Sequence, residues 1–287
     1  MHTDTEQFSS WVGKSQRHTD ILTLTPMTAM AATLDKSAMS ITQGMELPPL
    51  WHWLYFLNPA MQSELAADGH PSKGDFLPPI TLPRRMWAGS RLDFHQSLHA
   101  GERLERISTI KSVSLKQGRS GQLAFVCVGH EVFGENGLAL YEEHDIVYRE
   151  NAVAGAQSTE PKPAPEQADF CKEITPDPVL LFRYSALTFN SHRIHYDREY
   201  VTNVEAYPGL IVHGPLLATL LIDTLLENIS GSRLRKFEFK AISPVFDLNT
   251  FQVCGSQADA QGNCRLWITN HLAPSAWTPQ QRYRQTK

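Results

Sequence analysis

The chain has 287 residues, of which 41% are hydrophobic and 20% are charged, as expected for a soluble globular protein of one or two domains. A formal net charge of −4 excludes a global basic field, so neither nucleic acid nor anionic membrane is expected as a partner. The four cysteines (Cys127, Cys171, Cys254 and Cys264) form no CxxC pair and have no histidines at ligand spacing, which argues against a zinc site. Such scattered free thiols fit a reducing cytoplasm.

The N-terminus, Met-His-Thr-Asp-Thr-Glu-Gln, has neither the basic nor the apolar region of a signal peptide. The longest apolar stretch, residues 216–226, is interrupted by polar residues and is too short to span a bilayer. We therefore expect a cytoplasmic protein without a membrane segment.

The N-terminal half, residues 1–150, has a helix-like segment at 24–34. Strand-like runs follow at 91–99, 103–115, 122–132 and 138–148. Between them, residues 47–57 (LPPLWHWLYFL) form a densely aromatic insertion. This insertion either packs in the core or in a dimer contact, or it forms a wall of an acyl pocket.

Residues 151–178 are rich in Ala, Pro and Glu and lack periodicity, so we interpret them as an extended linker. The linker separates residues 1–150 from a second unit at 179–287. The similar order of elements in the two halves favours duplication of one folding unit.

The C-terminal half begins with an alternating run at 180–186, which indicates a strand, and continues with a polar turn at 188–197. A helix is predicted at 215–228, with Pro215 at its first position and Gly231 beyond its end. Further strands are predicted at 234–242, 249–256 and 264–272. Because the helix is apolar on nearly all faces, other structure should surround it.

The polar turn and the start of this helix carry the chemistry. His195 is the natural base or acid because an imidazole titrates near neutral pH; the alternative is a histidine satisfied by backbone at the end of a turn. The Asn190 amide can orient a water but cannot accept a proton near neutral pH, and it could simply be a turn residue. At His213-Gly214-Pro215, the backbone N–H groups of a helix start favour negative charge.

These motifs resemble a known family. The segments FRYSALTFNSHRIHYD and YPGLIVHGPLLATLL are similar to the active-site region of MaoC-type, (R)-specific enoyl-CoA hydratases. More loosely, WVGK at 11–14 and RMWAG at 85–89 extend the resemblance to the mesaconyl-C4-CoA and itaconyl-CoA hydratase group. The resemblance implies an α+β double hot-dog fold, in which each of two units wraps an antiparallel sheet around a helix.

The resemblance also implies the reaction. It is the reversible hydration of a short dicarboxylic enoyl-CoA, from mesaconyl-C4-CoA or itaconyl-CoA to citramalyl-CoA, as in itaconate catabolism. It needs no metal and no cofactor besides the CoA of the substrate. The alternatives are a 3-hydroxyacyl-thioester dehydratase of fatty acid metabolism and a non-catalytic acyl-thioester-binding protein. A homodimer is a further expectation.

In this family the acidic position of the turn is usually Asp, and here it is Asn190. The resemblance therefore assigns proton transfer to His195, water positioning to Asn190 and an oxyanion-hole N–H to Gly214. No such motif precedes the N-terminal helix, so we expect one active site per chain. The N-terminal unit would then hold the acyl group.

Substrate recognition requires cations. A buried substrate carboxylate needs a charged partner, for which Arg193 is our first choice and Arg84 our second, with Arg85 beside it. Arg193 could instead pair with Asp197. A basic cluster could contact the phosphates of CoA or form a solvated edge; it comprises Arg233, Arg235 and Lys236. Tyr184 and His213 complete the expected substrate-binding residues.

Overall fold

The computed structural model describes residues 4–37, 39–118, 121–150, 167–229, 231 and 233–270. The strands are β1 (Ser15–Ile21), β2 (Arg84–Phe94), β3 (Arg103–Gly118), β4 (Gly121–Gly134), β5 (Gly137–Arg149), β6 (Phe170–Ile174), β7 (Lys236–Lys240), β8 (Phe251–Gly255) and β9 (Leu266–Asn270). The α-helices are α1 (Leu24–Thr33), α2 (Pro178–Leu187), α3 (Arg198–Asn203) and α4 (Gly214–Asn228). Short 3-10 helices are η1 (Asp4–Trp11), η2 (Trp51–Leu54), η3 (Gln62–Glu64) and η4 (Arg193–His195).

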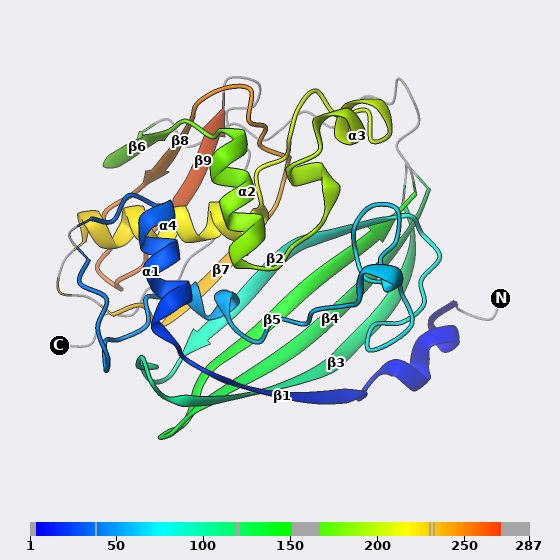
Figure 1. Ribbon diagram of the computed structural model, residues 1–287, viewed down its shortest axis with the longest axis horizontal. Helices are drawn as coiled ribbons and strands as arrows, with labels where there is room; N and C mark the ends of the chain where they lie inside the picture. The colour runs from blue at the N-terminus through cyan, green and yellow to red at the C-terminus, as the bar shows by residue number, and fades with distance from the viewer. Residues whose placement is uncertain are drawn as a thin grey trace.

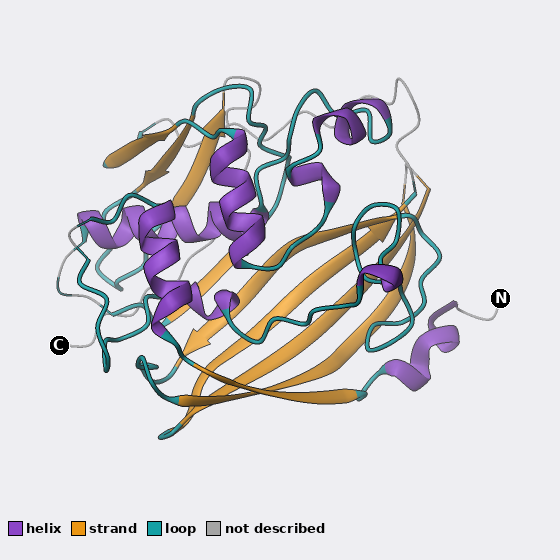
Figure 2. Cartoon of the chain, in the orientation of Figure 1, coloured by secondary structure: helices purple, strands orange, loops and turns teal. Residues whose placement is uncertain are grey.

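A six-stranded antiparallel sheet dominates the fold, with strand order β1-β3-β4-β5-β2-β7 (Figure 1). The helices gather over one end of this sheet, and irregular segments cross the rest of the same face (Figure 2). Its sixth strand, β7, comes from the C-terminal half and pairs with β2, so that Gly89 lies opposite Lys240. The two halves therefore share one sheet.

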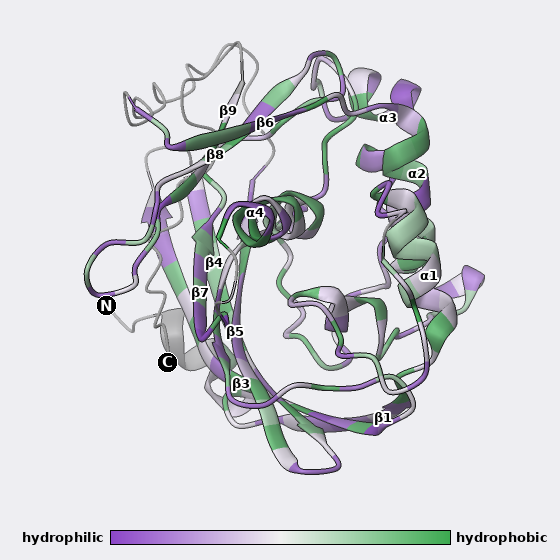
Figure 3. Ribbon diagram, turned by 90° about the vertical axis from the view of Figure 1, so that its left-hand side faces the viewer, coloured by the Kyte–Doolittle hydropathy of each residue, from purple (hydrophilic) through white to green (hydrophobic). Residues whose placement is uncertain are grey.

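Helix α4 is the centre of the second unit. Ten of its fifteen residues are buried, from Leu216 to Leu225. Figure 3 looks nearly along this helix and shows strands on one side of it and α2 on the other. No helix of the described residues is long and apolar enough to cross a bilayer. The buried helix under antiparallel strands confirms the predicted hot-dog arrangement.

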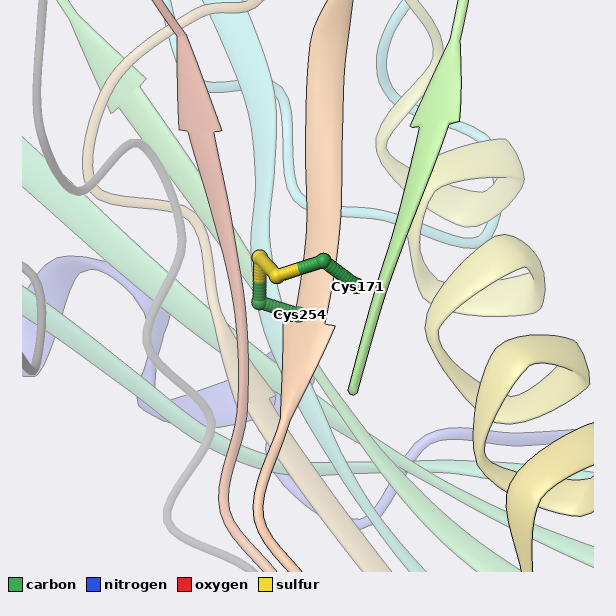
Figure 4. The surroundings of a disulfide bond; sticks show 2 residues. All are labelled: Cys171 and Cys254. Carbon is green, nitrogen blue, oxygen red and sulfur yellow. A yellow bond between two sulfur atoms is a disulfide. The ribbon is translucent and has the colours of Figure 1, made fainter. Parts of the chain in front are cut away.

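A smaller sheet, with order β6-β8-β9, covers α4. Cys171 on β6 lies directly opposite Cys254 on β8, and their Cα atoms are 4.2 Å apart. The two residues form a disulfide (Figure 4). The expectation that all four cysteines are free thiols is therefore wrong for this pair, because strand register places them face to face. Cys127 and Cys264 are free.

Two predicted segments differ from the structure. Residues 180–186 belong to helix α2: Pro178 is at its first turn, and the Asp177 carboxylate accepts from the Leu180 N–H at 2.7 Å. This N-cap stabilises a helix where alternation indicated a strand. The linker expected at 151–178 includes strand β6, because Phe170–Ile174 pair with β8. Residues 151–166 lie outside the described residues.

The strand expected at 91–99 is also displaced, since β2 begins at Arg84 and ends at Phe94. The remaining predicted helices and strands are found close to their expected positions. The aromatic insertion is part of the main hydrophobic core, in which Leu50, Trp51 and Leu54 are almost fully buried. Side chains of α4, including Leu216 and Leu221, belong to the same core. One core thus spans both halves of the chain.

Candidate active site

His195 lies at the end of η4, in the turn that follows α2, and is buried. Its Nδ1 is 2.7 Å from the carbonyl oxygen of Ile211. Because a carbonyl only accepts, Nδ1 carries the hydrogen and Nε2 keeps its lone pair. Burial lowers the pKa of His195 to about 4, although the hydrogen bond to Ile211 acts in the opposite direction. The side chain is therefore a neutral imidazole at physiological pH, with Nε2 as a base.

His213 stacks on His195, with ring centroids 3.7 Å apart and planes 17° from parallel. It is the N-cap residue of α4, is fully buried, and its Nε2 lies 2.7 Å from the Ser185 hydroxyl on α2. Tyr184, also buried, lies against the other side of the His213 ring at 5.0 Å. His213 and Tyr184 are thus packed in the interior beside His195, and Nδ1 of His213 has no hydrogen-bond partner among the described residues. Their assignment as substrate-binding residues stays a prediction.

Asn190 begins the turn. Its Oδ1 accepts a hydrogen bond from the His192 N–H at 3.1 Å, and its own N–H donates to the Ser185 carbonyl at 2.8 Å. The amide oxygen thus stabilises the turn, as asparagine side chains commonly do. Only the amide nitrogen is left for a water.

Gly214 is the first residue of α4, and Pro215 follows it. The first N–H groups of a helix have no acceptor within the helix and lie at its positive end. The Gly214 N–H is therefore suited to a negatively charged oxygen. His213 lies immediately before it, so the helix start and the His195 ring are neighbours.

The turn residue His192 adjoins His195, and two residues that the sequence analysis missed, His70 and Asp68, extend the cluster beyond it. The His192 ring is 5.5 Å from His195 and perpendicular to it, and the His70 ring is 3.9 Å from His192. Asp68 binds His70 through two hydrogen bonds, at 2.9 Å to its N–H and at 3.0 Å to Nδ1. Four imidazoles thus form a row: His70, His192, His195 and His213. The signal for this extension was the Asp68-Gly69-His70 tripeptide, which is polar and lies far from the turn in sequence.

Burial keeps the imidazoles of the row neutral, and neighbouring charges modify its effect. Burial lowers the pKa of His70, although the hydrogen bond that it donates to Asp68 offsets part of this effect. Burial and the neighbouring imidazoles of His70 and His195 lower the pKa of His192 to about 2. Burial acts to raise the pKa of Asp68, but the two hydrogen bonds from His70 and the charges of His70 and His192 together outweigh it, and the pKa falls below its usual range. Asp68 is therefore the anion of this cluster.

The segment around Gly69 is fixed to the catalytic turn by close backbone contacts. The Ser191 hydroxyl donates to the Gly69 carbonyl at 2.5 Å, and the Arg193 N–H donates to the Asp68 carbonyl at 2.9 Å. Gly69 has φ +88°, and a Cβ there would lie 1.9 Å from the Ser191 carbonyl oxygen. Only glycine fits this approach.

Two of the expected carboxylate-binding arginines are already paired, which corrects their assignment. Arg193 forms an ion pair with Asp197 at 2.8 Å and lies 4.1 Å from the centre of the Tyr200 ring. Arg84 forms an ion pair with Glu205 at 3.1 Å and donates to the Tyr207 hydroxyl. These pairs neutralise both guanidinium groups.

Arg85 differs from both. It lies opposite Tyr148 on β5; burial raises the pKa of that phenol, and the charge of Arg85 acts in the opposite direction. Its positive charge contributes to lowering the pKa of both His70 and His192, so it lies near the imidazole row. Arg85 has no ion-pair partner among the residues that the structure describes.

The basic cluster after α4 lies elsewhere. Lys236 pairs with Asp93 at 2.8 Å, and Asp93 lies eight positions after Arg85 on β2, a distance of roughly 25 Å along the strand. Arg233 donates to the Ser97 hydroxyl and lines a surface pocket with Glu46, Pro48, Phe94 and Gln96. Arg235 is beside the His95 carbonyl. The structure does not bring Arg233, Arg235 or Lys236 to the imidazole row.

One group of side chains has the composition of a metal site. Ligand atoms of Asp68, His70 and His192 all lie within 4.8 Å of one another. However, Nδ1 of His70 is bound to Asp68, and the His70 and His192 rings face each other with planes 41° apart. The contacts in this structure are thus those of an Asp–His pair stacked on a second imidazole.

Fold and site together define an acid–base enzyme whose imidazoles surround a helix N-terminus. The chain belongs to the hydroxyacyl-thioester dehydratase type 2 family, whose family model matches residues 50–247. It is therefore an enzyme of the hydratase and dehydratase class.

Individual relatives of this chain are named as hydratases or dehydratases. The chain is 45% identical over 244 residues to mesaconyl-C(4)-CoA hydratase of Chloroflexus aurantiacus, covering 85% of this chain and 87% of the relative. It is 28% identical over 281 residues to the mitochondrial hydroxyacyl-thioester dehydratase type 2 of Schizosaccharomyces pombe, covering 87% of this chain and 91% of that one.

Solved structures support the fold. A MaoC-like dehydratase from Phytophthora capsici superposes with a TM-score of 0.65 at 15% identity, over 96% of this chain and 97% of that one. A Mycobacterium tuberculosis protein described as a double hot-dog gives 0.55 at 14% identity, over 94% of each chain. The predicted double hot-dog fold is confirmed.

Proposed function

We propose that this enzyme reversibly hydrates a short, branched, dicarboxylic enoyl-CoA: mesaconyl-C4-CoA or itaconyl-CoA, giving citramalyl-CoA, in an itaconate-type catabolic route. The observation that carries the proposal is the 45% identity with the Chloroflexus aurantiacus hydratase over most of both chains. The reaction uses only acid–base and electrostatic catalysis, and the site is rich in groups for both.

The chemistry assigns a role to each element of the site. The Nε2 lone pair of His195 accepts a hydrogen bond from the water that attacks the β-carbon of the enoyl thioester. Negative charge moves to the thioester oxygen, where the Gly214 N–H at the start of α4 stabilises it. The amide nitrogen of Asn190 orients the water, since its oxygen is bound to the turn.

Arg85 is the cation that we assign to the free carboxylate of the substrate. A buried carboxylate without a partner is costly, and a guanidinium offers two parallel hydrogen bonds. Arg193 and Arg84 already have carboxylate partners, whereas Arg85 has no ion-pair partner among the described residues and lies opposite Tyr148, near the imidazole row. The side chain opposite it, Tyr148, could add a third hydrogen bond.

The second candidate is a 3-hydroxyacyl-thioester dehydratase of fatty acid metabolism. The description of the matching family and the name of the Schizosaccharomyces pombe relative favour it. The two candidates differ in the acyl group: a fatty chain supplies apolar area, whereas a short dicarboxylic group depends on charge recognition.

A steady-state assay of the purified protein separates the candidates. We expect kcat/KM for mesaconyl-C4-CoA to exceed that for crotonyl-CoA by at least about tenfold, because the neutral analogue leaves a polar site unpaired. Itaconyl-CoA completes the panel. Equal or better turnover of crotonyl-CoA and longer enoyl-CoAs would establish the fatty-acid dehydratase instead, and binding without turnover would establish an acyl-thioester-binding protein.

A cytoplasmic location and a homodimer complete the proposal. The Schizosaccharomyces pombe relative is named mitochondrial, and the Cys171–Cys254 disulfide is unusual for a reducing compartment, so location needs its own experiment. Counting free thiols in protein extracted under alkylating conditions tests the cytoplasmic location. Size-exclusion chromatography with light scattering tests the homodimer.

A further inference from the structure

Hydration of an enoyl thioester needs two proton transfers: one from water to a base, and one to the α-carbon. The catalytic turn lacks a free carboxylate for either. Asn190 cannot take a proton, and Asp197 is bound to Arg193 and to the Tyr200 N–H. His195 itself faces a neutral carbonyl through Nδ1, so nothing in the turn stabilises a positive imidazolium.

Asp68 and His70 supply, from the N-terminal half, what the turn lacks. One Asp68 oxygen accepts from the His70 backbone N–H and the other from its Nδ1–H. This double contact fixes the ring orientation and the tautomer, so the lone pair is on Nε2. A carboxylate bound to Nδ1–H also stabilises the imidazolium that forms when Nε2 takes a proton, as in Ser-His-Asp enzymes.

The position of the pair is fixed relative to the turn. His70 contacts the His192 ring, and His192 contacts His195. The backbone bonds at Gly69 and Asp68 join the same loop to Ser191 and Arg193. A surface histidine with a structural role would not need such a close backbone approach.

We propose that His70, held by Asp68, is a second acid–base residue of this site and acts beside His195 on the reacting water and α-carbon; this inference rests on the proposed function. Nε2 of His70 takes one proton from water as the water oxygen bonds to the β-carbon. The electron pair of the double bond moves through the α-carbon to the thioester oxygen, giving an enolate. The imidazolium then returns the proton to the α-carbon, and the thioester re-forms.

Each partner has a distinct task in this step. The second hydrogen of the water stays on the new hydroxyl group, and no oxidant or further reactant is required. Nε2 of His195 holds the water by accepting a hydrogen bond. Asp68 makes His70 the imidazole of the row that best carries positive charge between the two transfers.

Two variants test the proposal on the substrate that the wild type turns over fastest. We expect His70→Gln to lower kcat by about a hundredfold with little change in KM, the scale of a lost acid–base group. Asp68→Asn removes the charge that stabilises the imidazolium. The pKa of His70 should fall, so the acidic limb of kcat/KM should move to lower pH while kcat falls by about tenfold.

The matched control is His99→Gln. His99 forms the same kind of contact, Nδ1 to Glu102 at 2.9 Å, away from the imidazole row. It should keep wild-type kinetics. A folded His70→Gln variant within threefold of the wild type would overturn the proposal, as would an Asp68→Asn variant that loses activity without any movement of the pH limb. Loss of wild-type activity on chelation, with recovery on adding Zn²⁺, would show a metal site instead.

An NMR titration separates this inference from the proposed function. With histidine-labelled protein and no substrate, the His70 resonance, assigned by its absence in His70→Gln, should titrate at lower pH in Asp68→Asn than in the wild type. An unchanged titration refutes the Asp–His pair whatever the substrate. A lowered one, in a protein that hydrates none of the CoA substrates, supports the pair and refutes only the proposed reaction.

Discussion

Two histidine–carboxylate pairs lie in the N-terminal half, and they differ in almost every respect except composition. Glu142, on β5, is nearly fully buried and accepts three hydrogen bonds, from His52, Trp53 and Ser90. Asp68 is partly exposed, and its side chain binds only His70 among the described residues. The His52 ring lies in the core, whereas the His70 ring contacts His192 in the row of imidazoles.

The difference shows how to distinguish a structural pair from a functional one. Both carboxylate oxygens of Glu142 accept hydrogen bonds, and the donors belong to the aromatic insertion and to β2. This pair holds the insertion on the sheet. Asp68 orients one ring and leaves the Nε2 of that ring available. A buried network whose polar groups are all paired stabilises the fold. A side chain that keeps one polar atom unpaired can act on a ligand.

Removing the buried carboxylate should give the largest effect. Glu142→Ala leaves three buried donors unpaired, and we expect the free energy of unfolding to fall by about 3–5 kcal/mol, against at most about 1 kcal/mol for Asp68→Ala. Folding holds the pKa of Glu142 below its model value of 4.5, so its contribution is complete above that value and diminishes as the pH falls further. Urea denaturation at pH 7 and pH 4 measures both variants; equal losses would remove the distinction.

His195→Ala should affect activity without affecting the fold. We expect kcat to fall by about a hundredfold or more, because Nε2 of His195 holds the attacking water beside the start of α4. Circular dichroism should match that of the wild type. A folded variant with near-normal hydration would exclude His195 from the mechanism.

Arg85→Met should change substrate choice. We expect about a tenfold loss of kcat/KM for mesaconyl-C4-CoA and little loss for crotonyl-CoA, so the gap between them narrows. Arg91→Met is the matched control, because Arg91 lies on the same strand and pairs with Glu143 and Asp145. If both variants slow both substrates alike, Arg85 does not bind the carboxylate.

Asn190→Asp should have the smallest effect. Aspartate can still accept from the His192 N–H, so the turn should survive. The new charge should raise the pKa of His192 and His195 and move the acidic limb of the rate profile to higher pH, with kcat within about threefold of the wild type. A pH–rate series tests this. Wild-type rates in Asn190→Ala would show that the side chain has no role.

Much of the fold follows from local sequence signals. The strands β3 to β5 and the buried helix α4 are marked by periodicity, by Pro215 and by continuous apolar character, whereas β2 begins seven residues before the run expected at 91–99. Helix α2 was misassigned because its seven central residues alternate, while the Asp177-Pro178 start, which decides for a helix, was not weighed. The strand β6 was missed because it is short and follows a segment without periodicity.

The sequence predicted only those site residues that lie close together along the chain. His195, Asn190 and Gly214 lie within one stretch of chain, and the structure places His195 beside the start of α4. Asp68 and His70 lie more than a hundred residues away from that stretch, and no spacing rule connects them to it. The arginines were misjudged for the same reason, since Arg84 is paired with Glu205 and this contact depends on tertiary structure.

Strand β7 limits how this gene could be divided. Because β7 completes the sheet built by the N-terminal half, separating the halves would leave two open strand edges, at β2 and at β7. Neither fragment would be a self-contained module. A fission of the gene between the halves would therefore be tolerated only if both products were made together and reassembled through β2 and β7, and one made alone would be prone to aggregate.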